Sequence, residues 1–389
     1  MTLPRRQLLR ILPAALALPL RAWAVEGGAA TPGRFVLIFL RGGFDGLFAF
    51  APQEPRLAEL RPTLSRALLA EGTLLGNTGF AAHPAARGLA DLYKAGELCF
   101  APCAGTVDTS RSHFQAQDLF EIGSGAIHGR TGFMARAAAR LGAGSGAISF
   151  TPEIPLAFRG GEMPPAVAPL SGSGLKLPPG RLLDAIRAAH RGQATGDALE
   201  QAMATQAEID MATGMEPAAS RGAAGGNGLA RTMTSMGQIL RGNRRMSLAF
   251  MDLGGVDTHA NEEAVLTRLL PALGEGLQAL KTSLGHEEWR RTRVAVLTEF
   301  GRTVRENGTR GTDHGQGSLC LLAGGALAGA GMLGGFDGLA QKALNENRDL
   351  PVRADWRDLL ASAMREPCGL DEAGLDAIFP GRPRRSYRV

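Results

Sequence analysis

Short runs of apolar residues, each ending in a glycine-rich or polar turn, recur along the chain. A run that is apolar at nearly every position indicates a strand buried on both faces of a parallel sheet. Stretches with helical periodicity lie between these runs. The pattern predicts strands at 35–40, 97–103, 246–253, 293–300 and 318–325 and helices at 84–95, 113–122, 262–284 and 354–365. Strands alternating with helices predict an α/β fold with a mostly parallel sheet.

One long stretch departs from this pattern. Residues 140–230 are rich in Gly, Ala, Pro and Met, and they contain one clear helical pattern at 198–212. We interpret 140–230 as an insertion or cap on a single domain that spans residues 25–389.

The first 24 residues have the layout of an export signal. Arginines precede a short apolar stretch from Ile11 to Leu20, and Ala22-Trp-Ala24 provides a small-residue cleavage site. The adjacent Arg5 and Arg6 resemble a twin-arginine signal, which is recognised by the machinery that exports folded proteins. We therefore expect the twin-arginine export machinery to be a partner of this chain, and the protein to be periplasmic or secreted. An uncleaved anchor or an ordinary export signal is the alternative.

Composition and charge exclude several classes of protein. Among the 389 residues, 44% are hydrophobic and 20% are charged, which is typical of a globular chain. The net charge is +5, but removing residues 1–24 removes four arginines and no acid, and leaves 38 basic against 37 acidic residues. This balance argues against nucleic-acid binding. After residue 24 no apolar run is long enough for a transmembrane helix, so we expect no stable membrane span once the signal is removed.

The four cysteines are expected to pack in the core and not to form disulfides or a metal site. No CxxC pair is present, and Cys99, Cys103, Cys320 and Cys368 are too few for a disulfide scaffold. We expect four small buried side chains.

Polar side chains with catalytic potential follow several of the predicted strands. In open α/β sheets, functional groups gather where parallel strands end at their carboxyl edge. Here the residues that follow these strands, or lie in the next loop, are Asp45; Ser110, Ser112 and His113; Asp257 and His259; and Glu299, Asp313 and His314.

These residue types favour a metal site. Asp, Glu and His without Cys suit zinc, manganese or magnesium, as one ion or two. Asp257 and His259 are two residues apart, so on an extended backbone their side chains share one face. Asp313 and His314 are adjacent and can both serve one site only on an irregular loop, which the flanking glycines allow. The expected ligands are Asp45, Asp257, His259, Glu299, Asp313 and His314.

The predicted catalytic residues lie at the start of a helix. Ser112 would cap the helix at 113–122, where free backbone N–H groups favour anions. A metal-activated serine there would be a nucleophile, and His113 is a second catalytic candidate. Arg41 and Arg302 could hold an anionic substrate. Each residue also has an ordinary structural alternative, as a helix cap, a turn residue, an ion-pair partner or a solvated side chain.

The motifs that contain these residues resemble a known family. RGGFDGL, TSRSHFQAQD, GVDTHAN and TEFGRTVRENGTRGTDHG, with the glycine-rich strand that follows, are similar to the domain of unknown function 1501 family, within the alkaline-phosphatase-like superfamily. The resemblance runs from about residue 34 to the helix near 354–365 and implies an alkaline-phosphatase-like three-layer α/β/α sandwich.

The resemblance also implies roles for individual residues. It places Asp45 on one metal, Asp257 and His259 on the other, and Ser112 as the nucleophile, with Ser110 and Thr109 as rivals. Phe300 stands where a histidine commonly follows the strand-end carboxylate, here Glu299. Asp313 and His314 then supply either that missing pair or the last histidine. Val107 occupies the position where a sulfatase begins its C-x-P-S-R-like stretch, which argues against formylglycine chemistry.

Two functions fit these observations. The first is an exported metal-dependent hydrolase that cleaves a phosphate or sulfate ester, with Ser112 as the nucleophile. The second is a catalytically inactive protein of the same fold that binds or assembles a partner or a surface polymer in the periplasm. Phe300 favours the second function.

Overall fold

The computed structural model describes residues 33–389 except 107, 109, 143–144, 152, 162–164, 168–179 and 193–225. In these ranges the main sheet has nine strands in the order β11-β5-β10-β9-β1-β8-β6-β7, with β12 also paired to β5. Its strands are β1 (Arg34–Leu40), β5 (Leu98–Gly105), β6 (Gly146–Ser149), β7 (Ala166–Val167), β8 (Met246–Leu253), β9 (Thr292–Thr298), β10 (Ser318–Ala323), β11 (Gly331–Met332) and β12 (Ala354–Asp355).

Almost all neighbouring strands of this sheet are parallel. β1 pairs in parallel with β8 and β9, and β6 pairs in parallel with β7 and β8. β10 alone runs the other way, antiparallel to both β9 and β5. Since β5 and β9 both oppose β10, they point in the same direction as each other and as β1 and β8. The predicted α/β fold with a mostly parallel sheet is confirmed.

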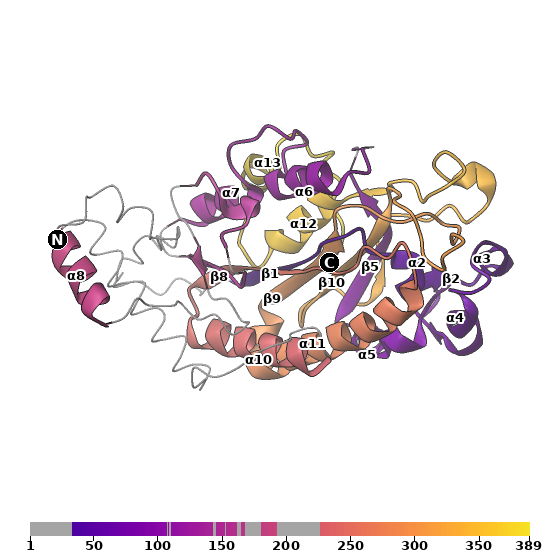
Figure 1. Ribbon diagram of the computed structural model, residues 1–389, viewed down its shortest axis with the longest axis horizontal. Helices are drawn as coiled ribbons and strands as arrows, with labels where there is room; N and C mark the ends of the chain where they lie inside the picture. The colour runs from indigo at the N-terminus through magenta and orange to yellow at the C-terminus, as the bar shows by residue number, and fades with distance from the viewer. Residues whose placement is uncertain are drawn as a thin grey trace.

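Helices cover both faces of the sheet, as Figure 1 shows. One face packs against α6 (His113–Ile122), α7 (Phe133–Leu141), α12 (Trp356–Arg365) and α13 (Glu372–Ile378). The other packs against α5 (Arg87–Lys94), α10 (Gly226–Gly242) and α11 (Glu262–Arg290).

The central strand β1 shows why its sequence is apolar throughout. Phe35, Leu37 and Phe39 belong to the hydrophobic core on the α12 side. The alternate residues Val36, Ile38 and Leu40 belong to the core on the α11 side. Because successive side chains of a strand point to opposite faces, a strand covered on both faces needs an apolar residue at every position.

The five predicted strands and four predicted helices all exist, with ends shifted by a few residues. The expectation for 140–230 needs a correction: β6 and β7 fall within it and extend the main sheet beyond β8. Ala147 and Ile148 are buried there, so these apolar residues complete the sheet. The helical pattern at 198–212 lies outside the described residues. α8 (Gly180–His190) lies away from the sheet in Figure 1 and buries no side chain.

The described structure also contains several shorter elements. A small sheet has the order β2-β4-β3. These elements are α2 (Gly46–Ala49), β2 (Phe50–Pro52), α3 (Pro55–Leu60), α4 (Arg66–Glu71), β3 (Thr73–Leu74), β4 (Phe80–Ala82), η1 (Pro84–Ala86), η2 (Leu156–Phe158) and η3 (Gln341–Ala343).

The cysteines are free and buried, as expected. Burial raises the pKa of the Cys99 thiol to about 11 and that of Cys368 to about 12, so both stay protonated at neutral pH. Among the described residues, none of the helices is both long enough and apolar enough to cross a membrane.

His83 is expected to make the stability of the fold depend on pH. Its side chain is 3% exposed, its ring stacks on Phe48, and its Nδ1 accepts a hydrogen bond from the Ala85 N–H at 3.0 Å. Burial lowers the pKa of His83 to about 4. The unfolded chain, with a pKa of about 6.5 at this histidine, therefore takes up its proton at a higher pH than the folded chain.

We expect His83 to reduce stability in mild acid. Its contribution is fully present above pH 6.5 and is lost as the pH falls towards 4, by up to about 3 kcal/mol. His83→Asn keeps an acceptor for the Ala85 N–H but does not titrate, so its free energy of unfolding should change less over this pH range. Urea denaturation at several pH values tests this, with the exposed His286→Asn as the control. Equal pH slopes for wild type and His83→Asn would show the prediction to be wrong.

Candidate metal centre

The direction of the strands brings the candidate residues to one edge of the sheet. β1, β5, β8 and β9 all end at this edge, so the loops after them meet there. β10 is antiparallel, so it begins at this edge, and the loop before it arrives from the same side. The loops that carry Asp257, Glu299 and His314 and the start of α6 at His113 therefore lie together.

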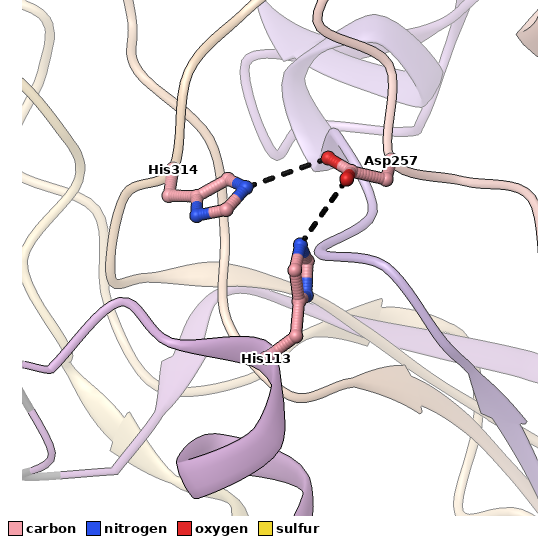
Figure 2. Close-up of side chains that lie close together, drawn as sticks. All are labelled: His113, Asp257 and His314. Atoms are coloured by element: carbon pink, nitrogen blue, oxygen red, sulfur yellow. Dashed lines mark hydrogen bonds and ion pairs between the residues drawn. The ribbon is translucent and has the colours of Figure 1, made fainter.

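Asp257, His113 and His314 converge on one point, as shown in Figure 2. The Nε2 atoms of His113 and His314 lie 3.4 Å from Oδ2 and Oδ1 of Asp257, respectively. One ligand atom from each residue lies within 4.8 Å of the other two. This spacing suits a divalent cation bound by imidazole nitrogens and a carboxylate oxygen.

The partners of the two rings fix which nitrogen faces this point. Nδ1 of His113 lies 2.8 Å from a carboxylate oxygen of Glu299, and Nδ1 of His314 lies 2.9 Å from the carbonyl oxygen of Arg111. These oxygens only accept hydrogen bonds, so each neutral ring carries its proton on Nδ1 and has a lone pair on Nε2. Metal-binding histidines are usually oriented in this way. Burial lowers the pKa of His314, which favours its neutral form.

His259 adds a third imidazole. Its Nδ1 lies 3.1 Å from Oδ1 of Asp313, and its Nε2 lies 2.9 Å from Nε2 of His314 and 3.2 Å from Oδ1 of Asp257. Two Nε2 lone pairs at 2.9 Å repel each other unless a proton or a cation lies between them or near both. Asp313 thus supports His259, while His259 itself approaches the cluster.

Glu299 lies behind His113. Its side chain is fully buried, and it accepts hydrogen bonds from His113, from the Gln117 side chain and from the Gly42 N–H, as well as from Thr298. Burial alone would raise the pKa of Glu299, but these hydrogen bonds, led by that from Gln117, hold it below its ordinary value. The structure therefore places Glu299 as an ionised support for His113.

Phe300 completes the support of the histidines. It is 6% exposed, and its ring centre lies 4.8 Å from those of both His113 and His314. At the position where the resemblance predicts a histidine, the chain has an apolar ring packed against two histidines.

Asp45 is not part of this cluster. It is buried and makes an ion pair with Arg61, and it also caps α2 by accepting a hydrogen bond from the Leu47 N–H. Burial tends to raise the pKa of Asp45, but the charge of Arg61 lowers it, so it is ionised. The contacts of the Asp45 carboxylate are therefore those of a helix cap after a glycine turn, which was the structural alternative to a metal ligand.

Glu262 is a buried residue near the cluster that the sequence does not identify as a candidate. Its Oε2 accepts hydrogen bonds from Thr258 and Thr312, which are next to Asp257 and Asp313 in sequence. Burial, together with the charge of Asp45, raises the pKa of Glu262 well above its ordinary value. Its place at the first position of α11 was visible in the sequence, but its contacts were not.

The two predicted substrate-binding arginines already have partners. Arg302 is fully buried and donates to Asp257 and to the carbonyl oxygens of Gly42, Gly43 and Thr312. Arg41 is paired with Glu121 and Asp252. Arg302 therefore orients Asp257, and it lowers the pKa of that carboxyl against the opposing effect of burial.

Ser110 and Ser112 precede His113 in the chain, and their side chains form no hydrogen bond to the metal-cluster residues in the part of the chain that the structure describes. Ser112 is the N-cap of α6, as predicted, but its side chain makes no capping hydrogen bond. Ser110 donates to Asp108 at 2.7 Å, and Thr109 lies outside the described residues. Between the two serines, Arg111 has a φ of 53°, a conformation rare for a residue with a side chain. This backbone directs the Arg111 carbonyl to His314, which the sequence could not reveal.

Comparisons with known proteins identify a family. Residues 181–386 match the family described as "Protein of unknown function (DUF1501)", a range that includes Asp257, His259 and His314. No curated protein matches the chain. The chain is also similar to a solved structure described as "Crystal structure of Ps i-CgsB in complex with k-i-k-neocarrahexaose", with 11% identity, a TM-score of 0.40, and coverage of 89% of this chain and 74% of that one.

The support of His113 by Glu299 predicts an effect on metal affinity. Glu299→Gln keeps the shape but removes the charge that holds the Nδ1 proton, so the affinity for Zn²⁺ should fall by about tenfold to a hundredfold. Competition with a fluorescent chelator measures this affinity. The exposed Glu287→Gln serves as the control, and thermal unfolding without metal checks that both variants fold. An unchanged affinity in Glu299→Gln would contradict this role.

Proposed function

The chain belongs to the DUF1501 family, whose description assigns no activity, and we propose that it is an exported metal-dependent hydrolase that cleaves a phosphate or sulfate ester. We also propose that its α/β fold is an alkaline-phosphatase-like three-layer sandwich. The sheet covered on both faces and the candidate residues gathered at its carboxyl edge support that assignment. Both proposals extend the resemblance found in the sequence motifs.

One observation carries the proposed metal dependence. The Nε2 atoms of His113, His259 and His314 lie 3.4, 3.2 and 3.4 Å from carboxylate oxygens of Asp257, while the Nδ1 atoms of the three rings face other acceptors. In addition, Nε2 of His113 is buried and has no hydrogen-bond partner within the described part of the chain. A buried polar nitrogen without a partner is unfavourable, and a cation would satisfy it. The residues therefore fit a divalent ion, with zinc favoured by the nitrogen-rich ligand set.

The contacts favour one ion over two. Asp45 is neutralised by Arg61, and Glu299 is occupied by His113 and its other donors. The proposed ligands are therefore His113, Asp257, His259 and His314. An ion held by these four residues would supply Lewis-acid chemistry for cleavage of an ester.

The residues around the ion would hold its ligands in a fixed orientation. Arg302 holds Asp257 in place, and Glu299 and Arg111 orient His113 and His314. We keep Ser112 as the proposed nucleophile because it directly precedes His113 and stands at the N-terminus of α6. The helix dipole there favours the anionic form of a serine and the negative charge of an ester.

Export remains part of the proposal. The twin-arginine-type segment lies in residues 1–24, outside the described residues. A route that carries folded proteins suits a site whose ligands come from three separate segments of the chain, since they assemble only after folding.

The alternative function, binding or assembly without catalysis, is favoured by one observation. Arg41 and Arg302 are both engaged by carboxylates, so neither has a free charge for an anionic ester. A protein that only binds a partner needs no such charge next to the metal.

Metal content tests the proposed centre. Protein purified without chelator should contain about one equivalent of a transition metal, as expected for one site with three or four protein ligands. Asp257→Ala and His314→Ala should lose it, while the exposed Asp118→Ala and His286→Ala should not. Mass spectrometry of the purified proteins measures this. A folded wild type that takes up no metal even after reloading would exclude the centre and favour the binding function.

Activity tests the nucleophile. With p-nitrophenyl phosphate and p-nitrophenyl sulfate as substrates, Ser112→Ala should lower kcat by about a thousandfold or more while keeping the metal. Ser110→Ala, two residues away, should stay near the wild-type rate. Loss of activity in Ser110→Ala but not in Ser112→Ala would assign the reaction to the other serine.

A further inference from the structure

We propose that a cavity beside the metal cluster binds a second anionic group of the substrate, separate from the ester that is cleaved. The cavity has a volume of about 470 Å³, and its lining includes Arg56, Arg305, Arg348, Asn307, Gln341 and Asp313. The inference rests on the proposed function only in identifying the ligand as a substrate. The anion site itself follows from the lining.

Three guanidinium groups line the cavity, and each has N–H groups to spare. Arg305 is exposed and, in the part of the chain that the structure describes, its guanidinium has no partner. Arg56 donates from Nε to the Leu339 carbonyl at 2.8 Å, and its nearest carboxylate, that of Glu59, is 3.8 Å away and 70% exposed. Arg348 is held by Asp349 and by the His314 carbonyl.

The acids in the lining are already occupied. Glu306 accepts hydrogen bonds from the N–H groups of Thr63 and Leu64, at 2.9 to 3.1 Å. Asp313 accepts from His259 at 3.1 Å. Neither carboxylate forms an ion pair with the three arginines in the described structure. The arginines therefore remain available for an external anion.

The chemistry of the lining defines the class of ligand. A guanidinium group presents paired N–H donors that match the oxygens of a sulfate, a phosphate or a carboxylate. Asn307 and Gln341 add neutral amide groups that can bind hydroxyls. The cavity thus suits an acidic group on a hydroxyl-bearing molecule, and it is poorly suited to an apolar one.

Two contacts connect the cavity to the metal cluster. Asp313 lines the cavity and also supports His259, and Arg348 lines it and donates to the carbonyl oxygen of His314. A molecule with its ester at the cluster can therefore place a neighbouring substituent among the arginines. Arg41 and Arg302 are engaged by carboxylates, and in this arrangement the arginines that recognise the substrate are instead those that line the cavity. The substrate class is an ester that carries a further negative group.

Binding of inorganic sulfate to the Asp257→Ala protein tests the cavity without the metal site. Isothermal titration calorimetry at constant ionic strength should detect binding that weakens by about tenfold in Arg305→Gln and in Arg56→Gln, each made in the Asp257→Ala background. Arg305→Lys should retain most of the affinity because it keeps the charge. Arg290→Gln, an exposed arginine outside the cavity, is the matched control. Thermal unfolding without sulfate verifies that each variant is folded.

The outcomes separate this inference from the proposed function. Sulfate binding that depends on Arg305 and Arg56 supports the cavity, whether or not the wild-type protein contains metal. Absent binding, or equal affinity in all variants, overturns the inference even if the metal centre and the esterase activity are present. With an active enzyme, Arg305→Gln should raise KM for a doubly anionic ester such as a sugar sulfate with a neighbouring carboxylate, and leave KM for p-nitrophenyl sulfate unchanged.

Discussion

The candidate centre depends on the antiparallel direction of β10. If β10 were parallel to its neighbours, the loop that precedes it would lie at the opposite edge of the sheet from Asp257 and His113. Because β10 runs the other way, the chain leaves β9 at Thr298, remains at the same edge through residues 299–317, and enters β10 from there. One loop can thus supply Glu299, Asp313 and His314 to a site that otherwise uses the ends of parallel strands.

Buried carboxylates hold the loops of this edge in place. Glu299 connects the Gly42 N–H with His113, and Glu262 connects Thr258 with Thr312. Asp45 and Arg61 form a buried ion pair, and Arg61 also donates to the backbone carbonyls of Thr303 and Val304. A buried polar or charged group without partners is costly, so each of these side chains restricts the loops to positions that satisfy it. The ligands of the proposed centre are consequently positioned before any ion binds.

This arrangement divides the charges of the site between two tasks. Arg41 neutralises Glu121 and Asp252, while Arg302 pairs with Asp257 and orients it. The arginines with free donors, Arg56 and Arg305, lie in the adjoining cavity. The proposed hydrolase would therefore hold the reacting ester mainly through the ion and the start of α6. It would recognise the rest of its substrate through the cavity.

The sequence by itself determined the strands, the helices and the loops in which chemistry was to be sought. Apolar runs and helical periodicity are local properties, and residues that follow parallel strands share one edge of the sheet, so Asp257 and the His113 segment could be expected at the same edge. Only the tertiary structure decided which candidates meet. His113 contacts Glu299, which is 186 residues away in the sequence, and His314 contacts the Arg111 carbonyl, which is 203 residues away. Asp45, in contrast, forms an ion pair with Arg61. Such pairings follow from strand order and direction, which no local pattern encodes.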